Sequence, residues 1–247
     1  MELDKKVALV TGALGGLGQE ICLALARGGC SVAANYFGKA FRRDAEGLTD
    51  QIKALGCRAI AVDADITKPD EVKRMVERTL EEFNTVDIYV NSAGFDQEAS
   101  LLELTEETWD AMVSGPQLKG AFLCCRTVAS TMLKNKLGKI VLLAGSTAFI
   151  GSAQYPHYAS MAVGVVTLVK SLAKGLAPFV NVNGVAPAHI ETHILKSCDE
   201  ITRNRIMESI PLKRFGKPSE VADAVLFLVT NDYVTGHTLL MTGGWVM

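Results

Sequence analysis

A glycine-rich turn near the start of the chain is the feature that most restricts how it can fold. The turn reads Thr-Gly-Ala-Leu-Gly-Gly-Leu-Gly over residues 11–18, between an apolar run at 6–10 and an amphipathic run at 16–27. Glycines at this place permit a tight turn and let a phosphate approach a helix N-terminus, where free N–H groups and the helix dipole favour anions. The pattern predicts a strand, a phosphate-binding turn and a helix, in that order.

The alternation of strand and helix continues along the whole chain. Short apolar or β-branched runs predict strands at 6–10, 31–35, 59–62, 86–90, 140–144, 180–185 and 238–241. Longer amphipathic runs predict helices at 16–27, 45–54, 68–83, 106–134, 159–176 and 218–229, the third with Thr67 as N-cap and Pro69 in its first turn. Buried parallel strands lack polar alternation, as these do. We therefore expect an α/β fold, a doubly wound parallel sheet with helices on both faces, and a ligand cleft at the carboxyl ends of the strands.

Composition indicates one globular domain over residues 1–247. Chains of this size commonly form one doubly wound domain, and no Pro- or Ser-rich linker interrupts this one. A formal charge of −2 offers no basic surface for nucleic acid or an anionic membrane. We find no basic leader and no apolar run near the roughly 18 residues of a membrane helix. The expected location is cytoplasmic, with neither nucleic acid nor membrane as partner.

Cysteine and histidine spacing does not predict a metal site. The six cysteines, at 22, 30, 57, 124, 125 and 198, form no C-x-x-C pair, so we expect small buried apolar side chains. His189 and His193 are four residues apart, but no Glu follows the first and no third ligand is evident. We expect no bound metal.

Further sequence blocks extend the resemblance of the turn to a known family. They are Asp65, Asn91-Ser92-Ala93-Gly94, Ser146, Tyr158, Pro187, Thr192, Ile-Pro-Leu-Lys-Arg-Phe-Gly-Lys-Pro-Ser-Glu-Val-Ala at 210–222, and Gly243-Gly244. In type and order they resemble the short-chain dehydrogenase/reductase family, in particular its 3-oxoacyl-thioester reductase branch, over effectively the whole chain. The resemblance implies a Rossmann-type fold and a nicotinamide dinucleotide cofactor. The residues it assigns to cofactor binding are Gly12, Gly16, Leu17, Gly18, Asn35, Asp65, Ile66, Asn91, Ala93, Gly94, Pro187 and Thr192.

The end of the second strand distinguishes the two nicotinamide cofactors in this family. A carboxylate there hydrogen-bonds the ribose 2′-hydroxyl and repels a 2′-phosphate. This chain has Asn35 and Tyr36 instead, followed by Lys39, Arg42 and Arg43. The missing carboxylate gives a slight preference for NADP over NAD, although a solvated basic helix start accounts for the cations equally well.

The catalytic set that the resemblance implies is incomplete. In the family a tyrosine transfers the proton, a serine positions the substrate oxygen, and a lysine four residues after the tyrosine lowers its pKa and holds the nicotinamide ribose. Tyr158 and Ser146 are present, but Ala162 occupies the lysine position. Val165 occupies the alternative position, used by the enoyl-reductase branch. Lys170 follows Tyr158 by twelve residues, about 18 Å along a helix, and cannot substitute.

A second departure concerns the asparagine that holds a water of the family's proton relay. Gln117 takes its place one residue later than expected, behind Gly115 and Pro116, a pair that breaks a helix. We expect the relay geometry to be damaged. His157, next to Tyr158, is a candidate auxiliary acid or base, but adjacent helical residues point apart, so a surface or substrate-rim position is expected.

Two hypotheses about function follow. The favoured one is a component of an NAD(P)-dependent 3-hydroxyacyl/3-oxoacyl thioester oxidoreductase in which this chain is silent or weak and assembles with an active homologue, as in the benzylsuccinate-pathway hydroxyacyl-CoA type of the family. The alternative is an active alcohol dehydrogenase or ketoreductase that uses Tyr158 and Ser146 without the lysine. The apolar faces of the helices carrying 121–132 and 163–172 exceed what one sheet buries. In this family those helices meet between subunits, so we expect a homo- or hetero-oligomer, a tetramer by resemblance.

Overall fold

Seven parallel strands form one sheet in the computed structural model, which describes residues 1–192, 195 and 199–247. Their order is β3-β2-β1-β4-β5-β6-β7, so the direction of strand addition reverses between β1 and β4. The strands are β1 (Val7–Thr11), β2 (Ser31–Tyr36), β3 (Ala59–Asp63), β4 (Ile88–Asn91), β5 (Gly138–Leu143), β6 (Val180–Pro187) and β7 (Thr238–Met241). The expected doubly wound α/β fold is confirmed.

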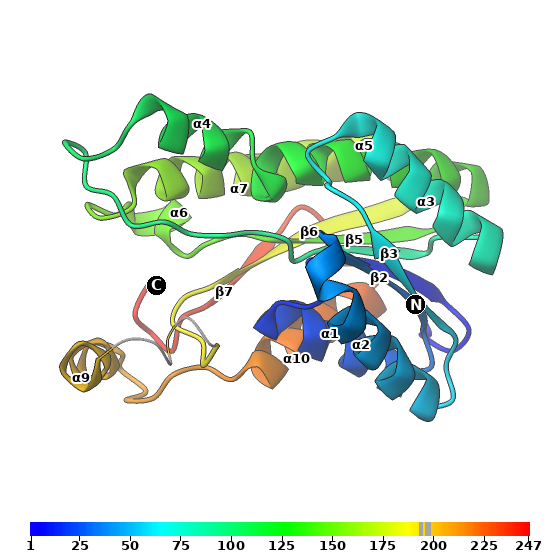
Figure 1. The fold of residues 1–247 in the computed structure, drawn as a ribbon, viewed down its shortest axis with the longest axis horizontal. Helices are drawn as coiled ribbons and strands as arrows, with labels where there is room; N and C mark the ends of the chain where they lie inside the picture. Colours follow the sequence, from blue (N-terminus) through cyan, green and yellow to red (C-terminus); the bar gives the residue numbers. More distant parts are fainter. Residues whose placement is uncertain (193–194, 196–198) are drawn as a thin grey trace.

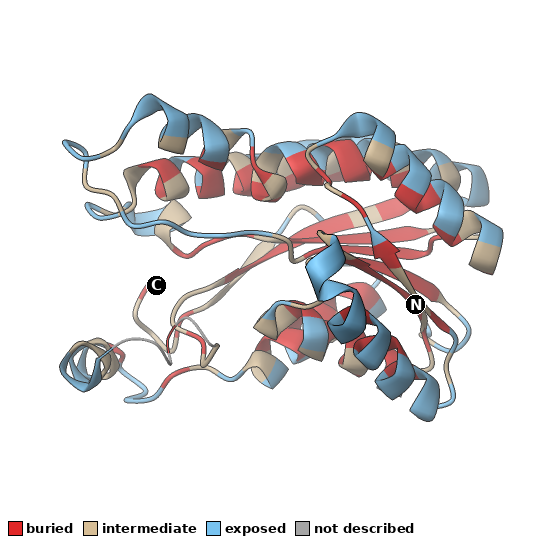
Figure 2. Ribbon diagram, viewed as in Figure 1, coloured by how far each residue is buried: buried red, intermediate tan, exposed pale blue. Residues whose placement is uncertain are grey.

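Helices cover both faces of the sheet (Figure 1). One layer holds α1 (Gly16–Arg27), α2 (Arg42–Ala54) and α10 (Pro218–Thr230). The other holds α3 (Pro69–Phe83), α5 (Ala121–Asn135) and α7 (Pro156–Leu176), with α4 (Glu106–Val113) beside α7. Each layer buries its inner side against the sheet, whose inner strands β1, β2, β4 and β5 are almost entirely buried (Figure 2). Two apolar cores result, one on each face, as the uninterrupted apolar strands predict.

The expected helix at 106–134 is interrupted. It consists of α4, a π-helical turn η2 (Pro116–Gly120), and α5. Pro116 has no backbone N–H and cannot continue α4, while Gly115 adopts an extended conformation immediately before it. The break predicted from the Gly-Pro pair is therefore present, and it changes the direction of the chain beside the ligand cleft.

Other boundaries differ in detail. Thr67 is not the N-cap of α3: the cap position is Lys68, and the Thr67 hydroxyl donates instead to Asp65 Oδ1 at 2.7 Å. Three short elements, η1 (Lys39–Phe41), α6 (Thr147–Ile150) and α9 (Glu200–Ser209), were not predicted. The α9 helix is largely solvent-exposed and lies at one end of the molecule (Figure 2). Because it has little apolar periodicity, its sequence gave no helical signal.

The cysteines are mostly buried, as expected. Cys22, Cys30, Cys124 and Cys125 are buried and Cys57 is half-buried, all as free thiols, whereas Cys198 lies outside the described residues. Helix α7, contrary to expectation, is long and apolar enough to cross a membrane by length and composition, with a mean hydropathy of 1.4. Its buried side packs on β6, which is how a core helix of this fold comes to be apolar.

Candidate active site

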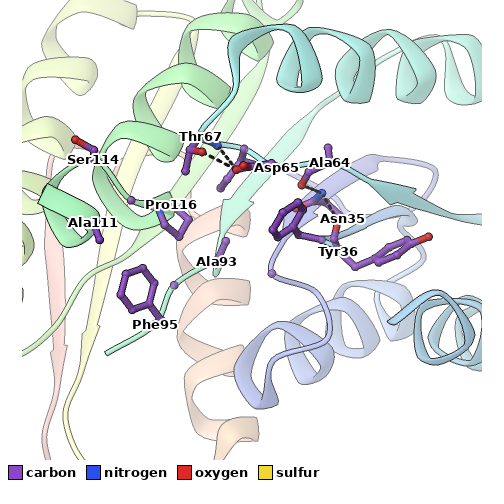
Figure 3. Close-up of a pocket in the computed structure, with 15 residues that line it drawn as sticks. Asn35, Tyr36, Ala64, Asp65, Thr67, Ala93, Phe95, Ala111, Ser114 and Pro116 are labelled. Atoms are coloured by element: carbon purple, nitrogen blue, oxygen red, sulfur yellow. Dashed lines mark hydrogen bonds between the residues drawn. The ribbon is translucent and has the colours of Figure 1, made fainter. Parts of the chain in front are cut away.

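A cavity of about 520 Å³ lies at the carboxyl ends of the strands where the order reverses (Figure 3). This is where a doubly wound sheet binds its ligand. Asn35, Tyr36, Ala64 and Asp65 line one side, and Phe95, Ala111 and Pro116 line the other. Of the residues predicted to bind a cofactor, the cavity wall contains Gly12, Asn35, Asp65, Ile66, Ala93 and Gly94.

The glycine-rich turn approaches neighbouring backbone so closely that it excludes side chains. Gly12 has φ of 65°, and a Cβ added to it would lie 2.5 Å from the Ala93 Cα. A Cβ on Gly18 would collide with the Gly12 carbonyl oxygen. The Ala13 N–H donates to the Asn35 carbonyl at 2.9 Å, which fixes the turn against β2. The turn therefore presents bare backbone and the N-terminus of α1, a cradle that fits a pyrophosphate.

Asp65 is oriented by a local turn at the end of β3. Its Oδ1 accepts from the Thr67 N–H at 2.9 Å and from the Thr67 hydroxyl at 2.7 Å (Figure 3). No hydrogen bond from the described residues engages the second carboxylate oxygen, which could accept from a ligand in the cavity. Sequence reasoning missed the part of Thr67, although a threonine two residues after an aspartate is the signal of such a turn.

Asn35 has a different environment from the one expected of a ribose ligand. It is buried, and its Nδ2 donates to the carbonyl oxygens of Val62 at 3.2 Å and Ala64 at 3.1 Å, across to β3. The amide donors thus hold two strands together at the cavity wall. Asn35 contributes shape here, and its donors are committed to backbone.

Asn91 likewise joins elements below the cavity. Its Oδ1 accepts from the Thr11 hydroxyl at 2.6 Å and the Tyr89 hydroxyl at 3.1 Å, and its Nδ2 donates to the Pro116 carbonyl at 3.3 Å. These bonds tie β1, β4 and η2 together. Asn91 is buried beneath the cleft and is not part of the cavity wall.

The turn after β6 brings the remaining predicted cofactor residues close to the same cleft. A Cβ on Gly16 would lie 3.4 Å from Thr192 Cγ2, so Thr192 lies against Gly16 at the start of α1. Leu17 is the next residue of this helix. The Pro187 carbonyl accepts from the Ser146 N–H at 3.2 Å. The loop after β6 therefore connects the phosphate turn with the candidate catalytic serine.

The Tyr158 phenol lies against Gly145, the residue that precedes Ser146. A Cβ added to Gly145 would be 2.5 Å from Tyr158 Cε1 and 2.9 Å from its hydroxyl. Burial, together with the carboxylate of Asp96, raises the pKa of Tyr158 to about 12. Sequence reasoning missed Asp96, because nothing in its spacing places it near Tyr158.

No cation accompanies this phenol within the described ranges 1–192, 195 and 199–247. Ala162 stands one turn after Tyr158 on α7 and is fully buried, as is Val165. Lys170 is exposed further along the same helix. The nearby charge that acts on Tyr158 is negative, where the lysine of a complete site would be positive.

Gln117 is directed at the loop after β4. Its side chain covers Gly94, where an added Cβ would lie 2.7 Å from the Gln117 Cδ, and its Nε2 donates to the Phe95 carbonyl. The Oε1 atom is buried and has no hydrogen-bond partner among the described residues. The amide donor of Gln117 thus holds Gly94 and Phe95, two residues of the cavity wall, in place.

The expectation that His157 lies at the surface or the substrate rim was wrong. The side chain is fully buried, because α4 and α6 both pack against the start of α7. Neither ring nitrogen has a hydrogen-bond partner in the described chain. His189 is half-buried in a separate cavity, and His193 lies outside the described residues. The residues that are described include no group of three or more metal-ligating side chains.

Comparison with known proteins agrees with this geometry. Residues 12–246 match the family described as enoyl-(acyl carrier protein) reductase. The 3-oxoacyl-[acyl-carrier-protein] reductase of Synechocystis sp. is 38% identical over 99% of this chain and 98% of its own length. The enzyme of the same name, FabG, is 36% identical in Staphylococcus epidermidis over 98% of this chain and 99% of its own, and 34% identical in Thermotoga maritima over the full length of both.

The fold is likewise that of a solved relative. A putative short-chain alcohol dehydrogenase from Sinorhizobium meliloti superposes with a TM-score of 0.91 at 31% identity, covering 99% of this chain and 98% of that one. The chain belongs to the short-chain dehydrogenase/reductase family. Membership implies binding of a nicotinamide dinucleotide, for which the cradle at Gly12 and Gly18 is suited.

Proposed function

We propose that this chain is a component of an NAD(P)-dependent 3-hydroxyacyl/3-oxoacyl thioester oxidoreductase, folded over residues 1–247 as one cytoplasmic domain, in which it is catalytically silent or weak. Its relatives named 3-oxoacyl-[acyl-carrier-protein] reductase support the reaction class. The observation that carries the silent role is Ala162, a fully buried alanine one helical turn from Tyr158.

Charge explains why that alanine matters. A phenol is a base near neutral pH only when positive charge stabilises its phenolate. Tyr158 has Asp96 as its charged neighbour, and its pKa of about 12 keeps it protonated. Loss of acid–base catalysis alone costs about 10²–10⁴-fold in rate. Loss of the ribose contact adds to this deficit.

The remaining residues still suit binding. Tyr158 and Ser146 would offer two hydroxyl donors to a carbonyl oxygen, from neighbouring positions that the contact of the phenol with Gly145 maintains. A nicotinamide cofactor supplies hydride chemistry when bound, and Gly12, Gly16, Gly18 and Asp65 would hold its phosphates and adenosine. At the nicotinamide end Pro187 and Thr192 remain, but no lysine is present to hold the ribose. Binding without efficient turnover is the expected combination.

The cofactor is NADP or NAD, with a slight preference for NADP. No carboxylate ends β2, and the donors of Asn35 are committed to β3. Three basic residues, Lys39, Arg42 and Arg43, come after β2 in the sequence. Arg42 forms a salt bridge with Glu46 at 2.9 Å, so Lys39 and Arg43 are the candidates to bind a 2′-phosphate. The Asp63 carboxylate at the end of β3 would repel a 2′-phosphate and so opposes the preference for NADP. One of its oxygens accepts a hydrogen bond from the Gly38 N–H at 2.9 Å.

Assembly with an active homologue would supply the missing chemistry. The outer sides of α5 and α7 expose Phe122, Leu133 and Val163, an apolar surface suited to another subunit. We propose a tetramer in which some subunits carry the complete lysine-containing site. Native mass spectrometry of the protein purified from its own cells tests this. The expected result is a stoichiometric complex with a lysine-bearing homologue, and a homo-oligomer alone would contradict the hetero-oligomeric arrangement.

The alternative is an active ketoreductase or alcohol dehydrogenase. It is supported by the contact between the Tyr158 phenol and Gly145, the residue that precedes Ser146. In this case Ser146 would hold the carbonyl oxygen and Tyr158 would donate its proton to that oxygen. Turnover by the isolated chain, abolished in Tyr158→Phe and Ser146→Ala, is the result that would establish this alternative.

A further inference from the structure

A second cavity lies apart from the candidate active site and has a different chemistry. Its volume is about 360 Å³, and it lies beyond the carboxyl ends of β6 and β7, next to the start of α10. It shares no lining residue with the larger cavity. The apolar part of its wall consists of Ile190, Ile210, Leu212, Leu239, Leu240 and Met241.

The charged groups of this cavity neutralise each other. Arg214 donates to both carboxylate oxygens of Glu220, at 2.8 and 2.6 Å, and Glu220 also accepts from the Lys217 N–H at 2.8 Å. Thr242 carries the hydroxyl among the described lining residues, and it donates to the Val246 carbonyl at 2.7 Å. A charged ligand would therefore find no unpaired partner among the described lining residues.

His189 differs from the polar side chains just described, because within the described residues they are engaged in hydrogen bonds and its ring is not. No hydrogen bond engages its ring in the part of the chain described here, while its edge-to-face contact with Trp245, at 4.7 Å between centroids, fixes its orientation. Burial lowers the pKa of His189. A neutral imidazole has one N–H donor and one acceptor nitrogen. It can thus bond one hydroxyl or carbonyl group in an otherwise apolar surrounding.

From this geometry we propose that the cavity at His189 binds a neutral, mainly apolar molecule with one hydroxyl or carbonyl group, at a site separate from the dinucleotide cleft. The volume lies within the range of small-molecule sites, and an apolar wall with one fixed polar group is their usual composition. The Gly216 N–H donates to the His189 carbonyl at 3.0 Å, and the Ala188 N–H donates to the Met241 carbonyl at 3.0 Å. These bonds hold the cavity walls together.

Trp245 provides the readout, because the chain contains only Trp109 besides it. In Trp109→Phe protein we titrate 1-hexanol against Trp245 fluorescence and compare hexanoate and hexylammonium, which have the same chain with a charge. The proposal expects a saturable change with hexanol and none with either ion. Saturation by hexanoate at equal concentration, or no saturable change with hexanol, would overturn it.

Variants separate this site from nonspecific partition of the alcohol. His189→Leu keeps the apolar volume and loses the hydrogen bond, so the hexanol affinity is expected to fall roughly fivefold to tenfold. His237→Leu, at an exposed histidine elsewhere, is the matched control and should bind normally. Should His189→Leu fail to fold, Leu212→Asp places a charge at a 63% exposed position of the wall and should abolish binding. Unchanged affinity in the folded variants, or displacement of hexanol by NADP, would contradict a separate site.

Discussion

Ala162 follows Tyr158 by one turn of α7 and is completely buried. In a complete site of this family that position holds the lysine that lowers the pKa of the tyrosine. Under the proposed function, this chain therefore has the tyrosine without the cation that would activate it.

Restoring the lysine is expected to be insufficient. Ala162→Lys places an ammonium one turn from Tyr158 and should lower the pKa of the phenol. The buried position must also accept a much larger side chain, at a cost of about 1–3 kcal/mol in unfolding free energy. Gln117, in η2, would still donate to the Phe95 carbonyl, so we expect the relay geometry to stay damaged. Urea unfolding and turnover of a 3-oxoacyl thioester check both points, and full activity in this variant would show that the lysine was the only defect.

The pH dependence of any residual alcohol oxidation should be that of an unactivated phenol. Only the phenolate accepts a proton, and with a pKa of about 12 its fraction is about 10⁻⁵ at pH 7 and rises tenfold per pH unit. The oxidation rate should therefore increase tenfold per unit from pH 7 to 10 without a plateau. Tyr158→Phe is the control and should lose this slope. A plateau below pH 9 would reveal a different, activated base.

Dinucleotide binding should persist in weakened form. Calorimetric titration is expected to detect both NADP and NAD, with NADP slightly tighter. Gly12→Ala should abolish binding, because φ is 65° and the new Cβ would lie 2.5 Å from the Ala93 Cα. Gly47→Ala, with open space around its Cβ, is the matched control and should bind as the unmodified chain does. No heat at millimolar dinucleotide in the unmodified chain would contradict the proposed cofactor site.

An ion cluster at the opposite end of the sheet should make stability depend on acid pH. The buried Lys139 Nζ donates to Asp232 at 2.7 Å, and this bond lowers the pKa of Asp232 to about 2. Since the folded chain holds this proton less tightly than the unfolded one, the contribution is present above the ordinary pKa and is lost as pH falls from about 4 to 2. Lys139→Met should therefore lose part of the stability difference between pH 6 and pH 3 in urea unfolding. An unchanged difference would show that the pair contributes nothing.

The sequence was most informative at positions where the backbone geometry or the burial of an element permits only one type of residue. Gly12 and Gly18 could be assigned because no side chain fits there, and the apolar strands because both their faces are covered. The break at Gly115-Pro116 was predictable from the missing N–H, but not the π-helical turn that follows. The side-chain direction of Asn35 and the burial of His157 could not be predicted, since both depend on which elements pack against these residues. Asp96 could not be placed near Tyr158, because Asp96 lies in the loop after β4 and Tyr158 in helix α7, and only the packing of the two elements brings them together.

The silent role proposed for this chain can be measured as the steady-state rate at which the purified chain alone reduces a 3-oxoacyl thioester with NADPH or NADH. We expect the turnover of this chain to be about 10²–10⁴-fold lower, or lower still, than that of a lysine-bearing relative under the same conditions, because acid–base catalysis and the ribose contact would both be missing. A mixture with such a relative should show only the activity of the relative's own sites. Turnover by the isolated chain at a rate similar to the relative's would contradict the silent-subunit account.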